Sequence, residues 1–520
     1  MRLLVIKSEI SNYWLATSIL MLVKLLLHLL TNTNYELHRD EMLYFNMADH
    51  LSFGYATVPP VTGFLAFIVK SISGHSVFGI RLIPALLGTA SIFIISKIVR
   101  DSGGGIPALI IASVSFILSP GFLLFDTLFT PNVVEQFLWL LTTYLLFRMT
   151  KLNSPVLWIW IGILMGLSFL TKYSVSFYIL GFFIAMLLTG CGKLFKTRYF
   201  YYSIIIGIII ITPNLIWQFT HGWPVMNHMQ ELKRTQLDNM EYINYLTDVV
   251  SLNSAAVLIW VAGFFSLLFL RAEKKSRFIG VASLLIFLFF FFSKGKGYYI
   301  LGLFPFLFAV GGCTMERYLK GRMNLVRYFV LLIIILYSMI SIPFGLQVMS
   351  FDQLCKYTEK TKHLLIYPFY RWEDGKIHNI SQVYSDMTGW RDLTFSVAKT
   401  YHQLSEEEQE KCTIFVERNY GVAGAIHFYG KEYRLPEPVT FLESYVMWAP
   451  DNIPDGPIIY IHKSPGGFNN LFDKITVTGS VNDNHFREYG LKIFLCTGPK
   501  TNIQEVYKQK AIEEKYLYRP

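Results

Sequence analysis

The sequence has 520 residues, of which 53% are hydrophobic and 16% charged, whereas about 25% of the residues in an average soluble domain are charged. A soluble protein of this size could not bury so many apolar side chains, so part of its surface must face lipid. The net charge is +10, but the basic residues lie between apolar runs, as the positive-inside rule for membrane proteins predicts. We find no basic, aromatic-rich patch typical of nucleic-acid binding and expect no nucleic-acid partner.

About eleven apolar runs are candidate membrane spans, because a span needs about 20 apolar residues. The first run has few positive residues before it and no small-residue cleavage motif after it, so we interpret it as a retained helix and not as a signal peptide. The runs cover residues 11–30, 77–99, 106–124, 131–148, 155–170, 173–189, 199–219, 254–270, 278–292, 298–313 and 325–343.

The charges of the loops predict the topology. With a cytoplasmic N-terminus, the inner loops carry about twice as many Lys and Arg residues as the outer loops, which favours that orientation. An odd number of spans then places the C-terminal part outside the cytoplasm. We therefore expect a multi-pass protein of the inner (plasma) membrane with a cytoplasmic N-terminus.

Two domains are predicted. Residues 1–346 form the transmembrane domain, whose outer loop 31–76 contains two short stretches that we interpret as interfacial helices. Residues 347–520 form an extracytoplasmic domain of soluble composition. Strands are predicted for QVYSDM, TIFVERN, PIIYIHK and KIFLCTG, and helices for WRDLTFSVAKTYHQL and GVAGAIHFYG. Strands alternating with helices indicate a small α/β domain.

The cysteines give no evidence of a metal or redox motif, because no two of them form a CxxC pair. Three of the five lie in the C-terminal part, and two of these would pair in an oxidising compartment. Their spacing does not say which; the three are Cys355, Cys412 and Cys496.

Asp40 and Glu41 follow Arg39 just outside the first span. Adjacent carboxylates at an interface can deprotonate a hydroxyl group or coordinate a cation. The alternative is a solvated first turn of a helix, where acidic residues favour the positive end of the helix dipole. The spacing alone favours this second interpretation.

Several cationic side chains lie on the outer side, where the positive-inside rule disfavours them. They are Lys172, Lys294, Lys296 and Arg81, and Tyr299 follows the pair formed by Lys294 and Lys296. A charge at membrane depth usually has a partner, and a phosphate at the level of the lipid headgroups would be one. The alternative for any single lysine is snorkelling to ordinary phospholipid headgroups. Several cations on one side, beside an acidic pair, favour a phosphate site.

Three further residues are candidates for a substrate cavity. Asp126 and Glu135 flank an outer turn, and Glu135 lies about one turn into a span. Each could instead be a helix-end carboxylate that reaches back to the interface. His221 begins the later long outer loop, 220–253, where a lone histidine is more often a surface hydrogen-bonding group than a ligand.

The order of these motifs resembles the GT-C superfamily of membrane glycosyltransferases. More narrowly, it resembles the bacterial branch of the protein O-mannosyltransferase family, which includes the lipid A aminoarabinose transferase. The motifs are Asp40-Glu41, the pair Pro59-Pro60, RLIPALLG, GLSFLTKYS and KGKGYYILGLFP. The stretch YSDMTGW…IFVERNYGVAGAIHFYG also resembles the C-terminal domain of some members.

The resemblance implies an inverting transfer of a sugar from a polyprenyl-phosphate donor to a lipid, glycan or protein acceptor on the outer face of the membrane. It assigns to Asp40 the action on the acceptor hydroxyl, with Glu41 in support. Two positions depart from the family pattern. Asn132 replaces an acidic residue of some relatives, and Val58 replaces a lysine of the aminoarabinose transferase. Phosphate binding would then depend on Lys172, Lys294 and Lys296. No metal ligand is assigned, and a divalent metal cofactor stays open.

Two other functions fit a polytopic protein with buried charges. A transporter or glycolipid flippase tends to place charges near mid-membrane and to contain inverted repeats. Here the charges gather at one face and no repeat is visible. The third candidate is a non-catalytic binder of lipid-linked glycans, which a transfer assay would separate from an enzyme.

Overall fold

The computed structural model describes residues 2–235, 240–361, 363 and 370–516. Contacts within the chain divide it into two units. The first, which we call the helical unit, comprises Met1–Asn34, Arg81–Pro213 and Lys233–Phe369. The second, the mixed unit, comprises Tyr35–Ile80, Asn214–Leu232 and Tyr370–Pro520. The mixed unit thus joins segments of two long loops to the C-terminal part, and the predicted boundary between residues 346 and 347 stays a prediction.

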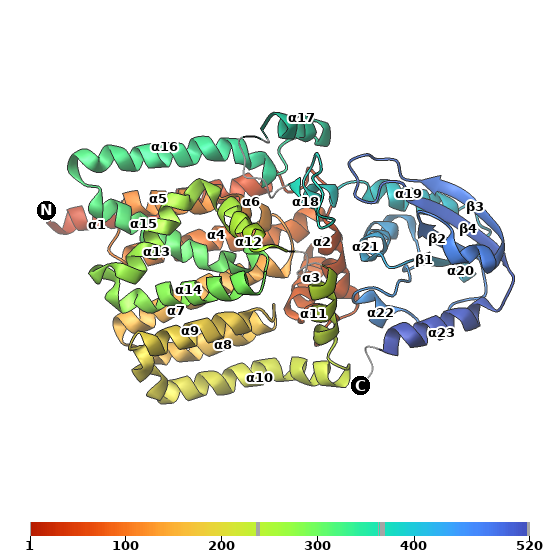
Figure 1. Ribbon diagram of the computed structural model, residues 1–520, viewed down its shortest axis with the longest axis horizontal. Coiled ribbons are helices and arrows are strands. Elements are labelled where there is room, and N and C mark those ends of the chain that lie inside the picture. The colour runs from red at the N-terminus through yellow and green to blue at the C-terminus, as the bar shows by residue number, and fades with distance from the viewer. Residues whose placement is uncertain (1, 236–239, 362, 364–369, 517–520) are drawn as a thin grey trace. The chain divides into compact units, whose positions relative to one another are not determined.

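Each of the eleven apolar runs is helical (Figure 1). The main helices of the helical unit, in chain order, are α1 (Arg2–Leu29), α4 (Val77–Asp101), α5 (Ile106–Leu118), α6 (Pro120–Phe125), α7 (Pro131–Leu152), α8 (Trp158–Phe169), α9 (Val175–Leu188), α10 (Arg198–Thr220), α12 (Tyr242–Leu252), α13 (Val257–Phe269), α14 (Arg277–Phe292), the 3₁₀ helix η7 (Gly297–Leu303), α15 (Phe304–Tyr318), α16 (Asn324–Ser341) and α17 (Phe351–Thr361).

The number of helices long enough to cross a membrane is smaller than the number of helices. Six helices in the described part are long and apolar enough to cross a membrane, and a pair bent by 75° would add a seventh. Some runs give shorter helices because of proline. The run 106–124 breaks at Ser119, which is extended (ψ 128°) because Pro120 disfavours a helical conformation in the residue before it. The count of eleven spans therefore stays a prediction, whereas a polytopic helical fold is confirmed.

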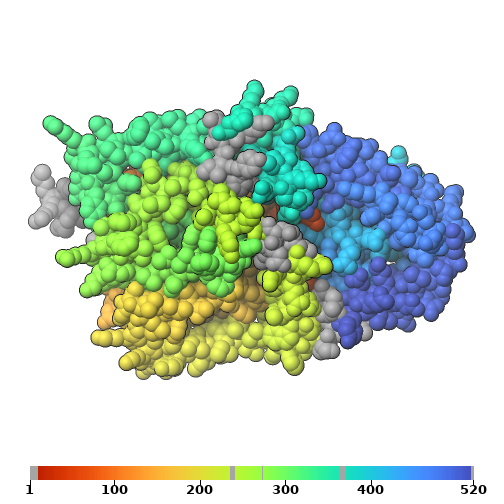
Figure 2. Space-filling model, in the orientation of Figure 1, coloured from red at the N-terminus to blue at the C-terminus, as the bar shows by residue number. Residues whose placement is uncertain are grey.

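The outer surface of the helical unit is apolar. Helices α10 and α16 lie at that surface in the space-filling view (Figure 2). Large apolar side chains project from both, as expected of a surface that faces lipid. They include Ile205, Ile209, Leu325, Phe329, Leu336 and Met339.

Inside the helical unit, α13 and α15 pack closely through two glycines. A Cβ atom on Gly263 would lie 2.1 Å from the carbonyl oxygen of Leu307, and one on Gly311 would lie 2.0 Å from that of Ile259. Any side chain at either position would therefore force the two backbones apart, which is the usual reason for small residues between membrane helices.

The mixed unit contains a four-stranded sheet with the strand order β1-β2-β4-β3. The pair β1/β2 is parallel, and the pairs β2/β4 and β3/β4 are antiparallel. The strands are β1 (Thr413–Val416), β2 (Ile458–His462), β3 (Phe472–Ser480) and β4 (Lys492–Pro499). The helices are α2 (Arg39–Asn46), the 3₁₀ helix η1 (Met47–Asp49), α3 (Val61–Ser73), α11 (Pro224–Thr235), α18 (Gln382–Ser385), α19 (Trp390–Tyr401), α20 (Glu406–Lys411), α21 (Tyr420–Tyr429), the 3₁₀ helix η11 (Gly430–Tyr433), α22 (Tyr445–Trp448) and α23 (Ile503–Tyr516).

The α/β prediction is confirmed, with two local errors. The stretch QVYSDM, predicted to be a strand, forms the short helix α18, because the Ser381 hydroxyl caps it by accepting the amide N–H of Tyr384. Strand β3 was not predicted, since most of its residues are exposed and it carries no continuous apolar pattern. All five cysteines are free thiols, so no disulfide pairing is present.

Helix α2 of the first loop packs on α21 of the C-terminal part, and both belong to the mixed unit. The Asn46 side chain donates to the carbonyl oxygen of Gly424 at 3.0 Å, and its amide lies 3.0 Å from the Tyr445 hydroxyl. The Phe45 and Phe428 rings meet edge to face, with centroids 5.4 Å apart. This packing brings Asp40 to the beginning of α21.

Candidate active site

The two carboxylates of the acidic pair have different surroundings. The backbone N–H of His38 donates to Glu41 Oε2 at 2.9 Å, and the His38 ring accepts the N–H of Asp40, so that His38 and Glu41 form a capping box at the start of α2. Glu41 is fully buried, whereas 35% of the Asp40 side chain is exposed. Glu41 therefore holds the helix end, and Asp40 is the carboxylate that a substrate can reach.

One oxygen of Asp40 is held by a tyrosine from the C-terminal part. The Tyr420 hydroxyl donates to Asp40 Oδ1 at 2.7 Å. Burial raises the pKa of Tyr420 well above its ordinary value, and the neighbouring Arg39 opposes this, so the phenol remains a proton donor. The bond fixes the direction of the carboxylate, and the other oxygen, Oδ2, lies 3.9 Å from His38 Nδ1.

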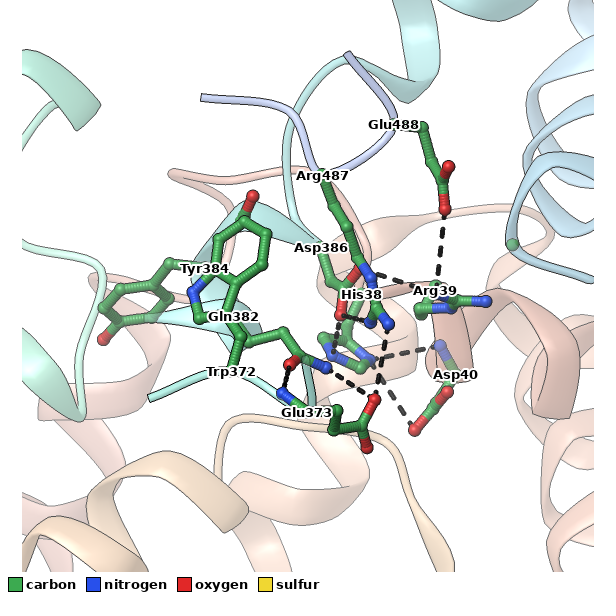
Figure 3. Close-up of polar contacts among 12 residues, drawn as sticks. His38, Arg39, Asp40, Trp372, Glu373, Gln382, Tyr384, Asp386, Arg487 and Glu488 are labelled. Atoms are coloured by element: carbon green, nitrogen blue, oxygen red, sulfur yellow. Dashed lines mark hydrogen bonds and ion pairs between the residues drawn. The ribbon is translucent and has the colours of Figure 1, made fainter. Parts of the chain in front are cut away.

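A buried ion network lies behind Asp40 (Figure 3). Arg487 contacts Asp386 at 2.9 Å, and Arg39 lies 3.9 Å from both Asp386 and Glu488. The Arg39 guanidinium also lies over the Tyr420 ring, 4.2 Å from its centroid. Burial raises the pKa of Asp386, while the surrounding cations lower it. The network fixes Arg39, and with it the first turn of α2 that carries Asp40.

His38 connects the helix cap to this network. Because its Nδ1 accepts the N–H of Asp40, the neutral ring carries its proton on Nε2. That nitrogen lies 3.6 Å from Asp386 Oδ2. The orientation of Asp40 thus depends on contacts from both sides of the first turn.

A further carboxyl group, Glu443, lies near Asp40. Burial raises the pKa of Glu443 to about 7, and the charge of Asp40 adds to the effect, while a hydrogen bond with Thr57 opposes it. Its backbone has φ 54°, which is uncommon for a residue other than glycine. Glu443 is therefore a group beside Asp40 that changes charge near neutral pH.

The raised pKa of Glu443 predicts a pH dependence of stability. An unfolded chain releases this proton near pH 4.5 and the folded protein only near pH 7, so the contribution is fully present below pH 4.5 and is lost as the pH rises through 7. The loss is on the order of 3 kcal/mol. Glu443→Gln should flatten the fall in melting temperature between pH 5 and 8, measured on detergent-solubilised protein. An unchanged slope would refute the assignment. Glu36→Gln should flatten the same fall in melting temperature, since burial also raises the pKa of Glu36 to about 7.

In the helical unit, Lys172 lies in a second polar cluster. Its ammonium group donates to Asn132 Oδ1 at 2.7 Å and contacts Glu135 Oε2 at 3.2 Å. It also lies 4.7 Å from the centroid of the Tyr299 ring. Ser174 donates to the other oxygen of Glu135. Asn132 and Glu135 both stand near the beginning of α7, which starts at Pro131. The Lys172 ammonium group therefore lies against the N-terminal end of this helix.

The other predicted cations lie differently. The Lys294 ammonium lies over the ring of Tyr242, 5.6 Å from its centroid, and not over Tyr299. The backbone carbonyl oxygen of Lys296 accepts the N–H of Tyr299 at 3.1 Å. Of the four residues predicted to meet at one phosphate, the structure therefore brings Lys172 to the Tyr299 ring and turns Lys294 toward α12.

Arg81 is fully buried in the helical unit. Its guanidinium donates to the carbonyl oxygen of Asn32 at 2.8 Å and to Gln347 Oε1 at 3.2 Å. These bonds connect the end of the first span to the segment after α16, which is a structural role. Its predicted contact with phosphate stays a prediction.

Asp126 forms a buried ion pair that the sequence did not suggest. Its Oδ2 lies 2.7 Å from the Lys24 ammonium, and both side chains are inaccessible to solvent. Lys24 also donates to the carbonyl oxygen of Phe122 at 3.0 Å. His28, one turn further along α1, contacts the hydroxyl of Thr127 at 3.1 Å. The pair therefore connects α1 to α6.

His221 belongs to the mixed unit and stacks on Trp217, with ring centroids 4.3 Å apart at an angle of 17°. Its Nδ1 lies 2.8 Å from the carbonyl oxygen of the same tryptophan. These contacts are local to the end of α10, and His221 also lines a pocket of the mixed unit together with His50 and Trp448.

Comparisons with known proteins agree with the resemblance seen in the sequence. Residues 57–217 match the sequence model of the family described as dolichyl-phosphate-mannose-protein mannosyltransferase. Over 195 residues the chain is 27% identical to lipid A galacturonosyltransferase RgtD of Rhizobium johnstonii. That match covers 37% of this chain and 41% of the relative, so the chain spans about two fifths of the length of this curated relative.

Two solved structures of ArnT from Cupriavidus metallidurans share the fold. The form bound to undecaprenyl phosphate has a TM-score of 0.60 and 13% identity, over 94% of this chain and 97% of that chain. The apo form has a TM-score of 0.60 and 12% identity, over 94% and 98%. The chain therefore has the fold of these two structures, and the predicted resemblance to membrane glycosyltransferases of the protein O-mannosyltransferase and aminoarabinose transferase-like family agrees with the family model and with the curated relative.

Proposed function

We propose that this protein transfers a sugar from a polyprenyl-phosphate donor to an acceptor hydroxyl group, with Asp40 as the base. The observation that carries the proposal is Asp40 itself: a partly exposed carboxylate, oriented by Tyr420 at 2.7 Å, at the position where the family motif has its acidic residue. The names of the relatives support the substrate classes, since one structure of ArnT holds undecaprenyl phosphate and RgtD is a lipid A galacturonosyltransferase. A glycolipid acceptor is accordingly the class that we propose.

The reaction is a displacement at the anomeric carbon of the sugar. The acceptor oxygen forms the new bond to that carbon while its proton passes to Asp40, and the bond from carbon to phosphate oxygen breaks. Attack opposite the leaving group inverts the configuration. The leaving polyprenyl phosphate keeps the electron pair and gains negative charge, which a lysine stabilises more strongly in the transition state than in the ground state.

Lys172 is the cation that we assign to this phosphate, with Lys296 and Tyr299 beside it. Its contacts with Asn132 and Glu135 hold the ammonium group in place. Where some relatives have an acidic residue, Asn132 contributes a neutral oxygen, so of these two neighbours only Glu135 competes with the phosphate for the ammonium group. Lys294 is assigned a secondary part in attracting the donor.

The proposed side of action is the outer face of the inner membrane. The loop charges and the odd number of predicted spans support an N-terminus in the cytoplasm and an extracytoplasmic segment 347–520. A reporter enzyme that is active only outside the cytoplasm, fused after Pro520, should therefore be active. Activity of a cytoplasmic reporter at the same position would contradict this topology.

Lipid analysis of whole cells tests the function. Expression of the protein in a bacterial host should produce a glycolipid whose mass exceeds that of its precursor by one sugar residue, and Asp40→Asn should not. A flippase would change the sidedness of a lipid without changing its mass. An unchanged set of masses, with the protein present in the membrane, would contradict an enzymatic function in that host.

A further inference from the structure

Another cluster of polar side chains, separate from the one around Lys172, lies in the mixed unit and does not include Asp40. Among the described residues, one group of histidine and carboxylate side chains brings its ligand atoms within 4.8 Å of one another: His50, His427 and Glu437. His50 follows η1, His427 stands in α21, and Glu437 lies in the loop after η11. We propose that these three residues bind a divalent transition-metal ion of the zinc type.

The distances between the ligand atoms fit such an ion. Glu437 Oε2 lies 3.3 Å from His50 Nε2, and Glu437 Oε1 lies 3.4 Å from His427 Nε2. Ligands about 2.0–2.1 Å from a tetrahedral zinc ion are separated by about 3.4 Å, which is the edge of the tetrahedron. The carboxylate thus lies between the two imidazole rings, with each of its oxygens close to the length of a tetrahedral edge from one of them.

Both imidazole rings are held in orientation. His50 stacks on Trp448, with ring centroids 4.4 Å apart at an angle of 12°. The His427 side chain is only 1% exposed, and its Nδ1 has no hydrogen-bond partner in the described part of the chain, so its polar contacts all go through Nε2. Pre-oriented ligand atoms lose little conformational freedom when a metal binds.

The donor atoms also suit a cation of this type, because imidazole nitrogens and carboxylate oxygens are both common ligands of zinc. Asp49 lies 3.0 Å from His427 Nε2, but Lys431 and Lys70 both pair with it. We therefore assign three protein ligands and leave the fourth position to water or to Asp49.

A metal ion here would fasten the first loop to the C-terminal part at a second point. The segment that carries Asp40 ends at His50, and the helix that carries Tyr420 contains His427 two turns later. The ion would therefore stabilise the pairing of α2 and α21 without touching the reacting atoms. This consequence does not depend on the proposed transferase reaction.

Zinc binding by the purified full-length protein tests the site. The protein carries an affinity tag without histidines, and Zn²⁺ is titrated against a chromophoric chelator while bound metal is measured by mass spectrometry. We expect about one tightly bound zinc ion per chain. His50→Ala and Glu437→Gln should weaken binding by more than about 100-fold, because losing even an outer-shell partner costs about 10- to 100-fold.

His402→Ala is the matched control, since His402 is an exposed histidine of the same unit outside the cluster. It should bind zinc as the wild type does. Chelation by EDTA should lower the melting temperature of the wild type and of His402→Ala, but not that of Glu437→Gln, whose side chain is 55% exposed in the parent and should not be needed for folding. Equal zinc binding by wild type and Glu437→Gln, or no stoichiometric zinc in the wild type, would overturn the proposal.

Discussion

Asp40→Asn is expected to lower the turnover number by about 100- to 10,000-fold, the range usually lost with a general base. Asparagine has nearly the same shape and can still accept the hydrogen bond of the Tyr420 hydroxyl, but it cannot take a proton from the acceptor. The melting temperature and the affinity for polyprenyl phosphate should therefore change little. Initial rates at saturating donor, measured on protein in lipid nanodiscs, give the comparison.

Two variants separate the base from its supports. Glu41→Gln weakens the helix cap, so stability should fall by about 1 kcal/mol while the turnover number falls far less than in Asp40→Asn. Tyr420→Phe removes the bond that orients Asp40 and should give an intermediate rate. If Asp40→Asn stays within a few-fold of the wild type, Asp40 is not the base.

Asp126→Asn should destabilise the helical unit by about 3–5 kcal/mol, because it leaves the Lys24 ammonium buried without its counter-charge. A Cβ atom on Gly88 would lie 2.5 Å from the Asp126 carboxyl group. Gly88 therefore packs closely against this carboxyl group and leaves no room on that side for a water molecule that would solvate the ammonium group. The expected result is a markedly lower melting temperature and a lower yield of folded protein, measured by fluorescence-detected size exclusion during heating.

The double variant Lys24→Met/Asp126→Asn is the control for this pair. Removing both charges leaves no uncompensated ion, so the double variant should be more stable than Asp126→Asn alone. If the double variant is less stable than the wild type by the sum of the effects of Lys24→Met alone and Asp126→Asn alone, the two side chains do not interact as the structure places them.

The helices of this protein were predictable because lipid and the interior both require apolar side chains, so spans appear as continuous runs. Lys24 was overlooked because it lies within the first apolar run. Its partner Asp126 is about 100 positions further along the chain. A charge inside a span indicates that a partner exists, but its identity depends on how the helices pack.

The candidate site was predictable only in part. The acidic pair and the lysine before Tyr173 stood out by position and by family resemblance, but sequence did not separate the roles of Asp40 and Glu41. The cap that buries Glu41 depends on His38, whose ring and backbone both take part in it. Tyr420 stands 380 positions from Asp40, and no local pattern connects residues at that separation. The ion network of Asp386 and Arg487 was missed for the same reason.

The central claim is tested most directly by following a labelled sugar. Wild type and Asp40→Asn, in matching nanodiscs, are given polyprenyl phosphate that carries a radiolabelled sugar, together with acceptor lipids extracted from bacterial outer membrane. The account predicts that the wild type moves the label to an acceptor lipid and releases an equal amount of free polyprenyl phosphate, whereas Asp40→Asn binds the donor and leaves it intact. Equal transfer by the two proteins, or no transfer by the wild type from any sugar donor of this class, would contradict it.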